Sequence, residues 1–250
     1  MSDKKSLGSK LERLDKCVSK LTELSRKDAT ALIKQGRVAV DGEVILSGAQ
    51  KVDINSEIRI DDDVINLYEE AFKKRVFMLN KPTDMVCADR DKNHRIVTSL
   101  FADELRYEEL HCAGRLDIDT TGLLIVTDDG ELIHEITHPK KEIAKVYRAV
   151  TDKAIPERAV KAFLKGMKHP EEREAYKSAK LEIIEDNVGM VTVSEGRFHE
   201  VKRLFECVGC EVIELTRLKI GALVLDEDLA EGEYRLLSDA EVELLFAKEE

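Results

Sequence analysis

A polar loop that leads directly into an apolar run constrains this chain more than any other feature. Residues 114–122 read GRLDIDTTG, and Leu123–Thr127 follow as a short β-branched run that ends at an Asp-Gly turn. Such a run, closed by turn residues, predicts a buried core strand. The polar loop before it therefore has a rigid support.

This loop carries two carboxylates, Asp117 and Asp119. If residues 115–119 are extended, their side chains alternate, and the two carboxylates share one face of the segment. A carboxylate held in this way suits a catalytic acid. The alternative is that both aspartates are turn and capping residues on a solvated loop. The loop by itself leaves both interpretations open.

The chain has 250 residues, which is enough for two domains, and we expect two. It has no apolar run of about 18 residues, and its polar start, Met1–Lys5, has no apolar stretch behind it that could form a signal peptide. We therefore expect a cytoplasmic protein without a membrane partner. The five cysteines are an odd number, so free thiols are expected rather than disulfides.

Cys207 and Cys210 form the only C-x-x-C pair. A zinc site needs about four ligands, and there is no second pair to supply the others. A redox motif opens a helix, whereas this pair lies at the end of a predicted one. We therefore expect no metal here, and a helix that ends near Gly209.

The net charge of −11 argues against binding to nucleic acid only if the charge is spread evenly. It is not: residues 1–40 carry a net charge of +5, and residues 221–250 carry −8. Nucleic acid therefore remains a candidate partner of the N-terminal part.

Two helices and a hairpin are predicted near the N-terminus. Apolar residues at helical spacing predict the first helix: Leu11, Leu14, Val18 and Leu21. Ser25 caps a second helix that ends at Gly36, and a strand over residues 38–43 turns at Asp41-Gly42. This αα-β unit leaves basic side chains outside its apolar stripe. An ordinary solvated helix face is the alternative interpretation of those side chains.

The pattern over about residues 10–55 resembles the S-four RNA-binding domain of ribosomal proteins. It rests on Arg13-Leu14-Asp15-Lys16, on Leu24-Ser25-Arg26 and on residues 32–42, which read LIKQGRVAVDG. The resemblance implies that structured RNA is held through its phosphates, with an affinity that falls as salt rises. The expected RNA-binding residues are Arg13, Lys16, Arg26, Lys27, Lys34 and Arg37.

An acidic segment without a clear core pattern, residues 61–74, is predicted to be a linker. It would separate an S-four-like RNA-binding domain over residues 10–60 from a catalytic domain over residues 75–247. The second domain begins with a strand over residues 76–82 that Pro82 ends, with Lys81 left at its exposed end.

The rest of the second domain mixes strands and helices. The expected elements are a helix over 131–137, a basic segment over 140–150, a helix from Pro156 to Gly166, antiparallel strands over 178–185 and 188–194, a helix with Val201, Leu204, Phe205 and Val208 buried, a strand region over 212–224, and an acidic helix capped by Ser238 and Glu241. Tyr147 lies among basic residues and suits stacking on a base; the alternative places it in the core of an amphipathic strand. The predicted fold class is α+β, with a small αα-β domain and a larger, mainly antiparallel sheet flanked by helices.

Four motifs together resemble the pseudouridine synthases, and they span nearly all of residues 75–235. They are Asn80-Lys81-Pro82, residues 114–124 with GRLD and TGLL, Lys145-Val146-Tyr147, and residues 195–203, which read EGRFHEVKR. The segment DIDTTG at 117–122 is closest to the branch of the family that modifies RNA of the small ribosomal subunit. The branch for large-subunit RNA is the alternative. Glu200 stands where the family usually has Gln.

The resemblance implies a role for each matching residue. Asp117 would be the nucleophile that attacks the uridine at its sugar or its base, Tyr147 would stack on the flipped base, and Lys202 would pair with Asp117. Arg203 is the alternative partner of Asp117. Further substrate contacts are expected from Arg115, Arg203, Ile220, Lys81 and His199. An isomerisation needs no metal, redox cofactor or nucleotide, so no cofactor is expected.

Two other functions fit parts of the sequence. Residues 117–121 also match the D-x-D-x-T motif of haloacid-dehalogenase-type phosphatases, but those enzymes place the first Asp after a hydrophobic strand, whereas here the apolar run follows it. A non-catalytic RNA-binding assembly factor is the other alternative, and the presence of Asp117, Tyr147 and a basic partner weighs against it. The expected partner is ribosomal RNA or an assembly intermediate of the small ribosomal subunit, bound by a monomer.

Overall fold

The computed structural model describes residues 11–22, 24–65, 74–104 and 106–247 of the chain. The chain divides into two compact units, Met1–Lys73 and Lys74–Glu250. Each unit has a hydrophobic core of its own. Within the described ranges, no helix combines the length and the apolar character needed to cross a membrane.

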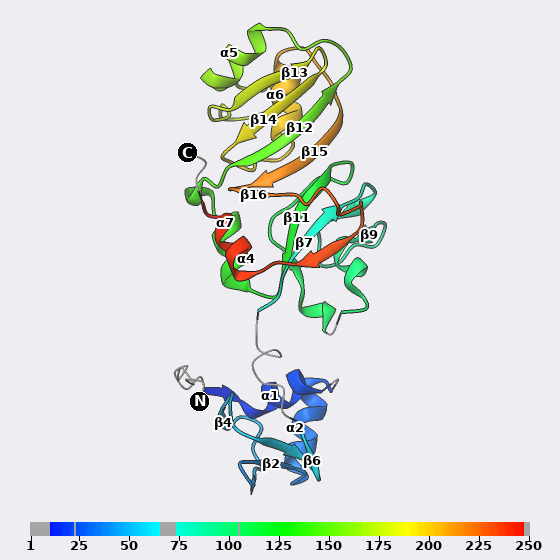
Figure 1. Ribbon diagram of the computed structural model, residues 1–250, viewed down its shortest axis with the longest axis vertical. Coiled ribbons are helices and arrows are strands. Elements are labelled where there is room, and N and C mark those ends of the chain that lie inside the picture. Colours follow the sequence, from blue (N-terminus) through cyan, green and yellow to red (C-terminus); the bar gives the residue numbers. More distant parts are fainter. Residues whose placement is uncertain (1–10, 23, 66–73, 105, 248–250) are drawn as a thin grey trace. The chain divides into compact units, whose positions relative to one another are not determined.

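The first unit joins a pair of helices to short strands (Figure 1). Its four-stranded sheet has the order β3-β2-β5-β6, and β1 pairs with β4 in a separate two-stranded sheet. The elements are β1 Leu11–Arg13, α1 Leu14–Leu21, α2 Arg26–Lys34, β2 Val38–Val40, β3 Glu43–Val44, β4 Lys51–Asp53, β5 Ile58–Ile60 and β6 Asp63–Val64.

The core of the first unit forms between the two helices and the strands. Its fully buried members are Leu14, Cys17, Val18, Ala29, Ile33, Val38 and Ile58. The Ser25 hydroxyl accepts a hydrogen bond from the Asp28 N–H at 3.2 Å, so the predicted cap of α2 is confirmed. Leu11 was wrongly assigned to the first helix: it pairs with Asp53 in β1 and is 58% exposed. An extended backbone at Leu11 turns its side chain away from the face that α1 buries.

The first part of the predicted linker belongs to the sheet of this unit. Asp63–Val64 form β6 and pair with β5, after a turn at Asp61, whose φ is 53°. The Asp61 carboxylate pairs with Arg37, which gives an acidic residue a reason to occupy this turn. The sequence shows no core pattern there because both residues of β6 are exposed. The following residues of the predicted linker, 66–73, lie outside the described ranges.

The second unit is built on one large mixed sheet, in which β11 and β15 are parallel and the other pairs are antiparallel (Figure 1). The strand order is β13-β14-β12-β15-β11-β7-β17, with β10 beside β11 and β16 beside β15. The predicted α+β class with a mainly antiparallel sheet is therefore confirmed. The elements are β7 Val76–Lys81, β8 Met85–Val86, β9 Arg95–Ile96, η1 Val97–Phe101, η2 Tyr107–Glu109, β10 His111–Cys112, β11 Thr121–Thr127, α4 Gly130–Thr137, η3 Pro139–Lys141, β12 Lys145–Thr151, α5 Arg158–Lys165, β13 Lys180–Glu185, β14 Val188–Val193, α6 Glu200–Cys207, β15 Val212–Ile220, β16 Leu223–Val224, β17 Tyr234–Leu236 and α7 Asp239–Leu244.

Strand β11 is buried on both faces. Leu124 and Val126 belong to one core, which includes residues of α5 and α6, while Leu123 and Ile125 belong to a second core with α4. A strand covered on both sides has no polar face, which explains why its sequence is a continuous apolar run. The predicted core strand after the polar loop is confirmed.

Several other predicted elements are confirmed. The helices predicted after β11, after Pro156 and after His199 correspond to α4, α5 and α6, and the two predicted antiparallel strands correspond to β13 and β14. Ser238 and Glu241 form a capping box at α7. Gly209 has a φ of 87° just beyond α6, so the C-x-x-C pair ends this helix as predicted.

Candidate active site

The loop that carries the two carboxylates is folded rather than extended. The Thr120 N–H donates to the Asp117 carbonyl oxygen at 3.1 Å, and Ile118 and Asp119 form the turn between them. The predicted alternation of side chains is therefore wrong, because a turn breaks the two-residue period of a strand. The side chain of Asp117 is 29% exposed and that of Asp119 is 65% exposed, so the two carboxylates have different environments.

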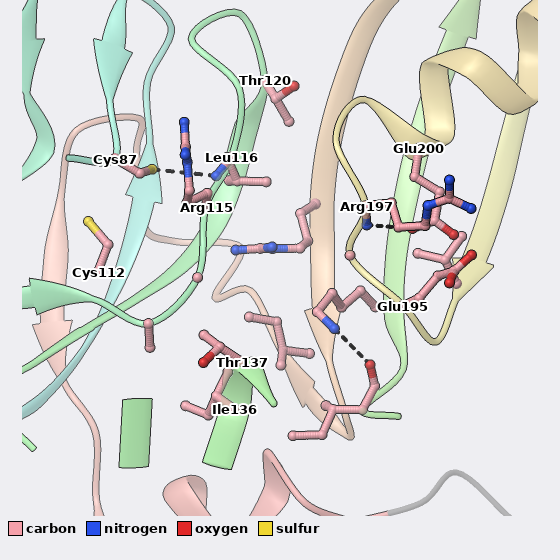
Figure 2. Close-up of a pocket in the computed structure, with 18 of the residues that line it drawn as sticks. Cys87, Cys112, Arg115, Leu116, Thr120, Ile136, Thr137, Glu195, Arg197 and Glu200 are labelled. Carbon is pink, nitrogen blue, oxygen red and sulfur yellow. Dashed lines mark hydrogen bonds between the residues drawn. The ribbon is translucent and has the colours of Figure 1, made fainter. Parts of the chain in front are cut away.

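Lys81 supports this loop from inside the protein. It is fully buried, and its ammonium donates hydrogen bonds to the carbonyl oxygens of Pro82 at 2.8 Å and Thr120 at 3.0 Å. Burial lowers the pKa of Lys81. The prediction of an exposed strand end was wrong, because the loop folds over the end of β7. A second support is the Leu116 N–H, which donates to the Cys87 sulfur at 3.4 Å (Figure 2).

Asp117 faces a cavity of about 890 Å³, within the size range of small-molecule sites. Strands β12 and β15, the loop before α6 and the end of α4 contribute to its wall (Figure 2). The predicted site residues that line it are Asp117, Arg115, Tyr147, His199 and Ile220. Those that do not line it are Lys81, Lys202 and Arg203. Among the described residues, no three His, Cys, Asp or Glu side chains are grouped to hold a metal ion.

Two basic side chains approach the Asp117 carboxylate. His199 Nε2 lies 3.5 Å from Asp117 Oδ1, and Lys202 Nζ lies 3.9 Å from Asp117 Oδ2. The ammonium of Lys202 is closer to Asp119, whose two carboxylate oxygens it meets at 2.6 and 2.7 Å. Burial acts to raise the pKa of Asp119, but the hydrogen bond and charge of Lys202 outweigh it and lower this pKa. Asp119 therefore holds Lys202 beside Asp117.

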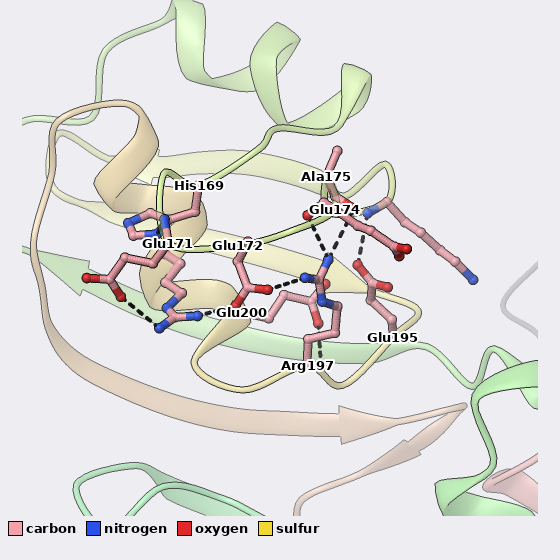
Figure 3. A network of polar contacts seen from close by, with 10 residues as sticks. His169, Glu171, Glu172, Glu174, Ala175, Glu195, Arg197 and Glu200 are labelled. Carbon is pink, nitrogen blue, oxygen red and sulfur yellow. Dashed lines mark hydrogen bonds and ion pairs between the residues drawn. The ribbon is translucent and has the colours of Figure 1, made fainter.

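Arg203 does not pair with Asp117, so the alternative assignment is wrong. It forms ion pairs with Glu171 and Glu172, which lie on the segment between α5 and β13 (Figure 3). Arg197 is bound by the same segment, through Glu172 and the carbonyl oxygen of Ala175 at 3.1 Å. The ion-pair partners of Arg203 are therefore carboxylates of this segment and not Asp117.

Tyr147 and Arg217 form the inner wall of the cavity. Tyr147 is 9% exposed on β12, so the ring is buried as the core interpretation predicts, and it also lines the cavity. Its stacking on a base stays a prediction. Arg217 on β15 is 2% exposed and donates to the Tyr147 hydroxyl oxygen at 3.4 Å. Sequence reasoning missed Arg217 as a site residue. The signal for it was a charged residue at an inward position of a strand, two residues after the buried Leu215.

A buried carboxylate lies at the outer part of the cavity wall. Glu200 is 5% exposed and accepts a hydrogen bond from the Arg197 N–H at 3.1 Å (Figure 2). Burial and the neighbouring Glu195 raise the pKa of Glu200 to about 7. Lys145 lines the same wall, and burial together with the charge of Arg217 lowers its pKa to about 8.

Glu200→Gln is expected to stabilise the protein at pH 8. A carboxyl whose pKa is raised from 4.5 to about 7 on folding loses stability as the pH rises through this window, because the folded state binds the extra proton. The neutral amide avoids that loss, so we expect a gain of about 3 kcal/mol at pH 8 and almost none at pH 4.5. Urea unfolding at the two pH values measures the difference. Glu182→Gln, at an exposed position on β13, is the control, and an equal gain there would contradict the argument.

Four of the six predicted RNA-binding residues in the first unit are ion-paired. Arg13 and Arg26 both bind the buried Asp15, and the other two pairs are Lys16 with Glu12 and Arg37 with Asp61. Lys27 and Lys34 are exposed, and neither has an ion-pair partner among the described residues. These two lysines are therefore the cations on α2 that no ion pair in the described part of the chain occupies.

Comparison with known proteins agrees with this architecture. A family model described as RNA pseudouridylate synthase matches residues 75–207, and an S-four domain model matches residues 12–58. The fold and the matches thus define an RNA pseudouridine synthase with an N-terminal RNA-binding domain.

Individual relatives narrow this class. The Haemophilus influenzae protein called ribosomal small subunit pseudouridine synthase A is 42% identical over 233 residues, which is 93% of this chain and 99% of that protein. The Escherichia coli protein of the same name is 41% identical over 230 residues, 92% of this chain and 98% of that protein. A crystal structure of a pseudouridylate synthase matches with a TM-score of 0.66 at 41% identity, covering 93% of this chain and 99% of that one. The chain belongs to the family of ribosomal small subunit pseudouridine synthase A. The phosphatase and the non-catalytic alternatives are excluded by this membership.

Proposed function

We propose that this enzyme converts a uridine of small-subunit ribosomal RNA into pseudouridine, with Asp117 as the nucleophile. The observation that carries the proposal is the position of the Asp117 carboxylate. It lies at the cavity, within 3.5 Å of His199 and 3.9 Å of Lys202, on a loop that Lys81 fixes from the protein interior. Two relatives named for the small subunit, each more than 40% identical, support the choice of RNA.

The cavity suits an extruded uracil ring. A uridine in folded RNA has to leave its stack before a carboxylate can reach it. Tyr147 would stack on the ring, and Ile220, which is 1% exposed, would form the apolar wall opposite the polar groups. His199 and Lys202 lie beside the Asp117 carboxylate and would orient it for the attack.

The reaction is an isomerisation within one nucleotide. Asp117 would form a bond to the sugar or to the base, the N1–C1′ bond would break, and a new bond would join C5 to C1′; the bond to Asp117 would then break and free the carboxylate. The proton on C5 would leave, and N1 would take one up, so atoms and charge balance without a co-reactant. All the side chains of this scheme come from the second unit of one chain, so a monomer would suffice for the reaction. The proposed enzyme acts in the cytoplasm on ribosomal RNA or on an assembly intermediate.

Mapping of pseudouridine in ribosomal RNA tests the substrate. Cells that lack the protein are expected to lose pseudouridine at one small-subunit position, and the wild-type gene, but not Asp117→Asn, is expected to restore it. Loss confined to large-subunit RNA would favour the large-subunit alternative and overturn this part of the proposal. Assay of the purified enzyme on free RNA and on assembly particles then separates the two forms of the substrate.

The double variant Lys27→Gln/Lys34→Gln is expected to bind RNA more weakly and with a flatter salt dependence. Each phosphate contact that is lost lowers the slope of log K against log salt by about 0.7 to 0.9, so the double variant should lose about 1.5. Filter binding across a salt series measures this slope. Lys51→Gln, at an exposed position on β4 of the same unit, is the control and should keep the wild-type slope. An unchanged slope in the double variant would remove α2 from the RNA-binding surface.

A further inference from the structure

Arg217 is a buried cation without a counter-ion. It is 2% exposed on β15, and no carboxylate of the described residues lies within 4 Å of its guanidinium. Removing an unpaired charge from water costs free energy, because the interior does not replace its hydration. Stabilisation of the fold therefore does not explain why an arginine occupies this buried position.

The hydrogen bonds of this guanidinium are incomplete. Its Nε donates to the Leu123 carbonyl oxygen at 2.7 Å, and Nη1 donates to the Tyr147 hydroxyl at 3.4 Å. Nη2 is buried and has no hydrogen-bond partner among the described residues. A guanidinium carries five N–H donors in a fixed plane, so the two bonds that position Arg217 leave donors unused. The residue lines the same cavity as Asp117, where a ligand can supply the missing acceptor.

A second basic side chain, Lys145, lies near Arg217 on the cavity wall. Burial and the charge of Arg217 lower the pKa of Lys145. The carboxylates of Glu195 and Glu200 also line the cavity, but neither forms an ion pair with Arg217. A group that gains negative charge during a reaction would be stabilised beside Tyr147.

The proposed reaction generates negative charge on the base. When the N1–C1′ bond breaks, its electron pair stays with the uracil ring and is delocalised onto the ring carbonyl oxygens until C5 bonds to C1′. Attack of a carboxylate on the ring itself would load the same oxygens. We propose that Arg217 is a further catalytic residue, whose guanidinium donates one of its unused N–H groups to a carbonyl oxygen of the flipped uracil and stabilises the anionic ring. This inference rests on the proposed pseudouridine synthesis.

Arg217→Met tests this role, because it keeps the length of the side chain and removes its charge. We expect the single-turnover rate at saturating RNA to fall by about 10² to 10³, as it does when one donor to a developing anion is removed, with RNA affinity within about threefold of wild type. The melting temperature should stay the same or rise, because the unpaired buried charge is gone. Arg217→Lys keeps the charge but not the planar group, so its single-turnover rate should lie between those of the wild type and Arg217→Met. Arg148→Met, at a partly exposed position on the same sheet and outside the cavity lining, is the control and should keep the wild-type rate.

Three outcomes overturn the inference. One is a wild-type rate in Arg217→Met, and another is a weaker RNA affinity with an unchanged maximal rate, which would assign Arg217 to binding alone. The third is a lower melting temperature with a normal rate per folded molecule, which would make Arg217 structural. If Arg217→Met does not fold, the rate and affinity of Arg217→Lys decide by the same criteria. Failure of the proposed function is distinct, since the wild-type enzyme would then form no pseudouridine in small-subunit RNA.

Discussion

Asp117→Asn is expected to abolish pseudouridine formation, with a single-turnover rate at least about 10³-fold below that of the wild type. The amide has nearly the shape of the carboxylate, but it carries no charge and is a poor nucleophile. The RNA affinity should stay within about threefold of wild type, because Asp117 makes up a small part of the surface that RNA covers. Rapid-quench assay of the modified nucleoside and filter binding measure the two quantities.

Asp119→Asn is the matched control for this change. It removes a second carboxylate from the same turn, but one that is 65% exposed and contacts Lys202 rather than the cavity. We expect a loss of about tenfold, because Lys202 loses the oxygens that hold it beside Asp117. Equal losses in the two variants would mean that the turn acts as a unit. A fully active Asp117→Asn enzyme would rule out nucleophilic catalysis by this residue.

Local patterns in the sequence predict much of the fold. The strand over Leu123–Thr127, the cap at Ser25 and the capping box at Ser238 depend on neighbours a few residues away, and all are confirmed. The motif residues Asp117, Tyr147 and Ile220 also lie together at one cavity, as a shared site requires. Such features are readable because the interactions that produce them are short in sequence.

Two of the errors involve contacts between residues far apart in the sequence. Lys81 is buried because a loop nearly 40 residues later supplies its carbonyl acceptors. Arg203 is taken up by carboxylates about 30 residues before it. In each case a charged side chain looked exposed, since nothing in its own segment satisfied it. Arg217 was missed for the same reason, because its hydrogen-bond partners, Leu123 and Tyr147, lie far from it in the sequence.

The charge of the first unit shows a related limit. Its basic residues suggest an RNA-binding face, yet Asp15 alone binds two of the six predicted arginines and lysines. Ion pairs within the domain reduce the cations that are free to meet phosphates, and a count of charges does not reveal this. Lys27 and Lys34 on α2 are therefore the most informative positions for a test of the predicted surface.

Gly122→Ala is expected to have the largest effect on stability. Gly122 has a φ of 99°, and an added Cβ would lie 2.3 Å from the Arg217 carbonyl oxygen and 2.8 Å from the Arg217 nitrogen. Both obstacles are backbone atoms of the parallel strand β15, so a side-chain movement does not relieve them. We expect the free energy of unfolding of the second unit to fall by about 4 kcal/mol. Urea unfolding of the full chain, followed by a probe in this unit, measures it.

Gly130→Ala provides the contrast, because no atom lies within 4 Å of its added Cβ and it begins α4. Its effect should stay within about 1 kcal/mol and should be stabilising if anything. Gly122 on β11 pairs with Lys81 on β7 and with Arg217 on β15. The three strands approach closely at this point, so Lys81, which supports the loop, and Arg217, which lines the cavity, both depend on the space at Gly122. Gly122→Ala should therefore lose activity even at temperatures where it remains folded. If Gly122→Ala has normal stability and a normal rate, β11 and β15 tolerate a wider separation, and the position of Arg217 does not depend on how close these two strands are.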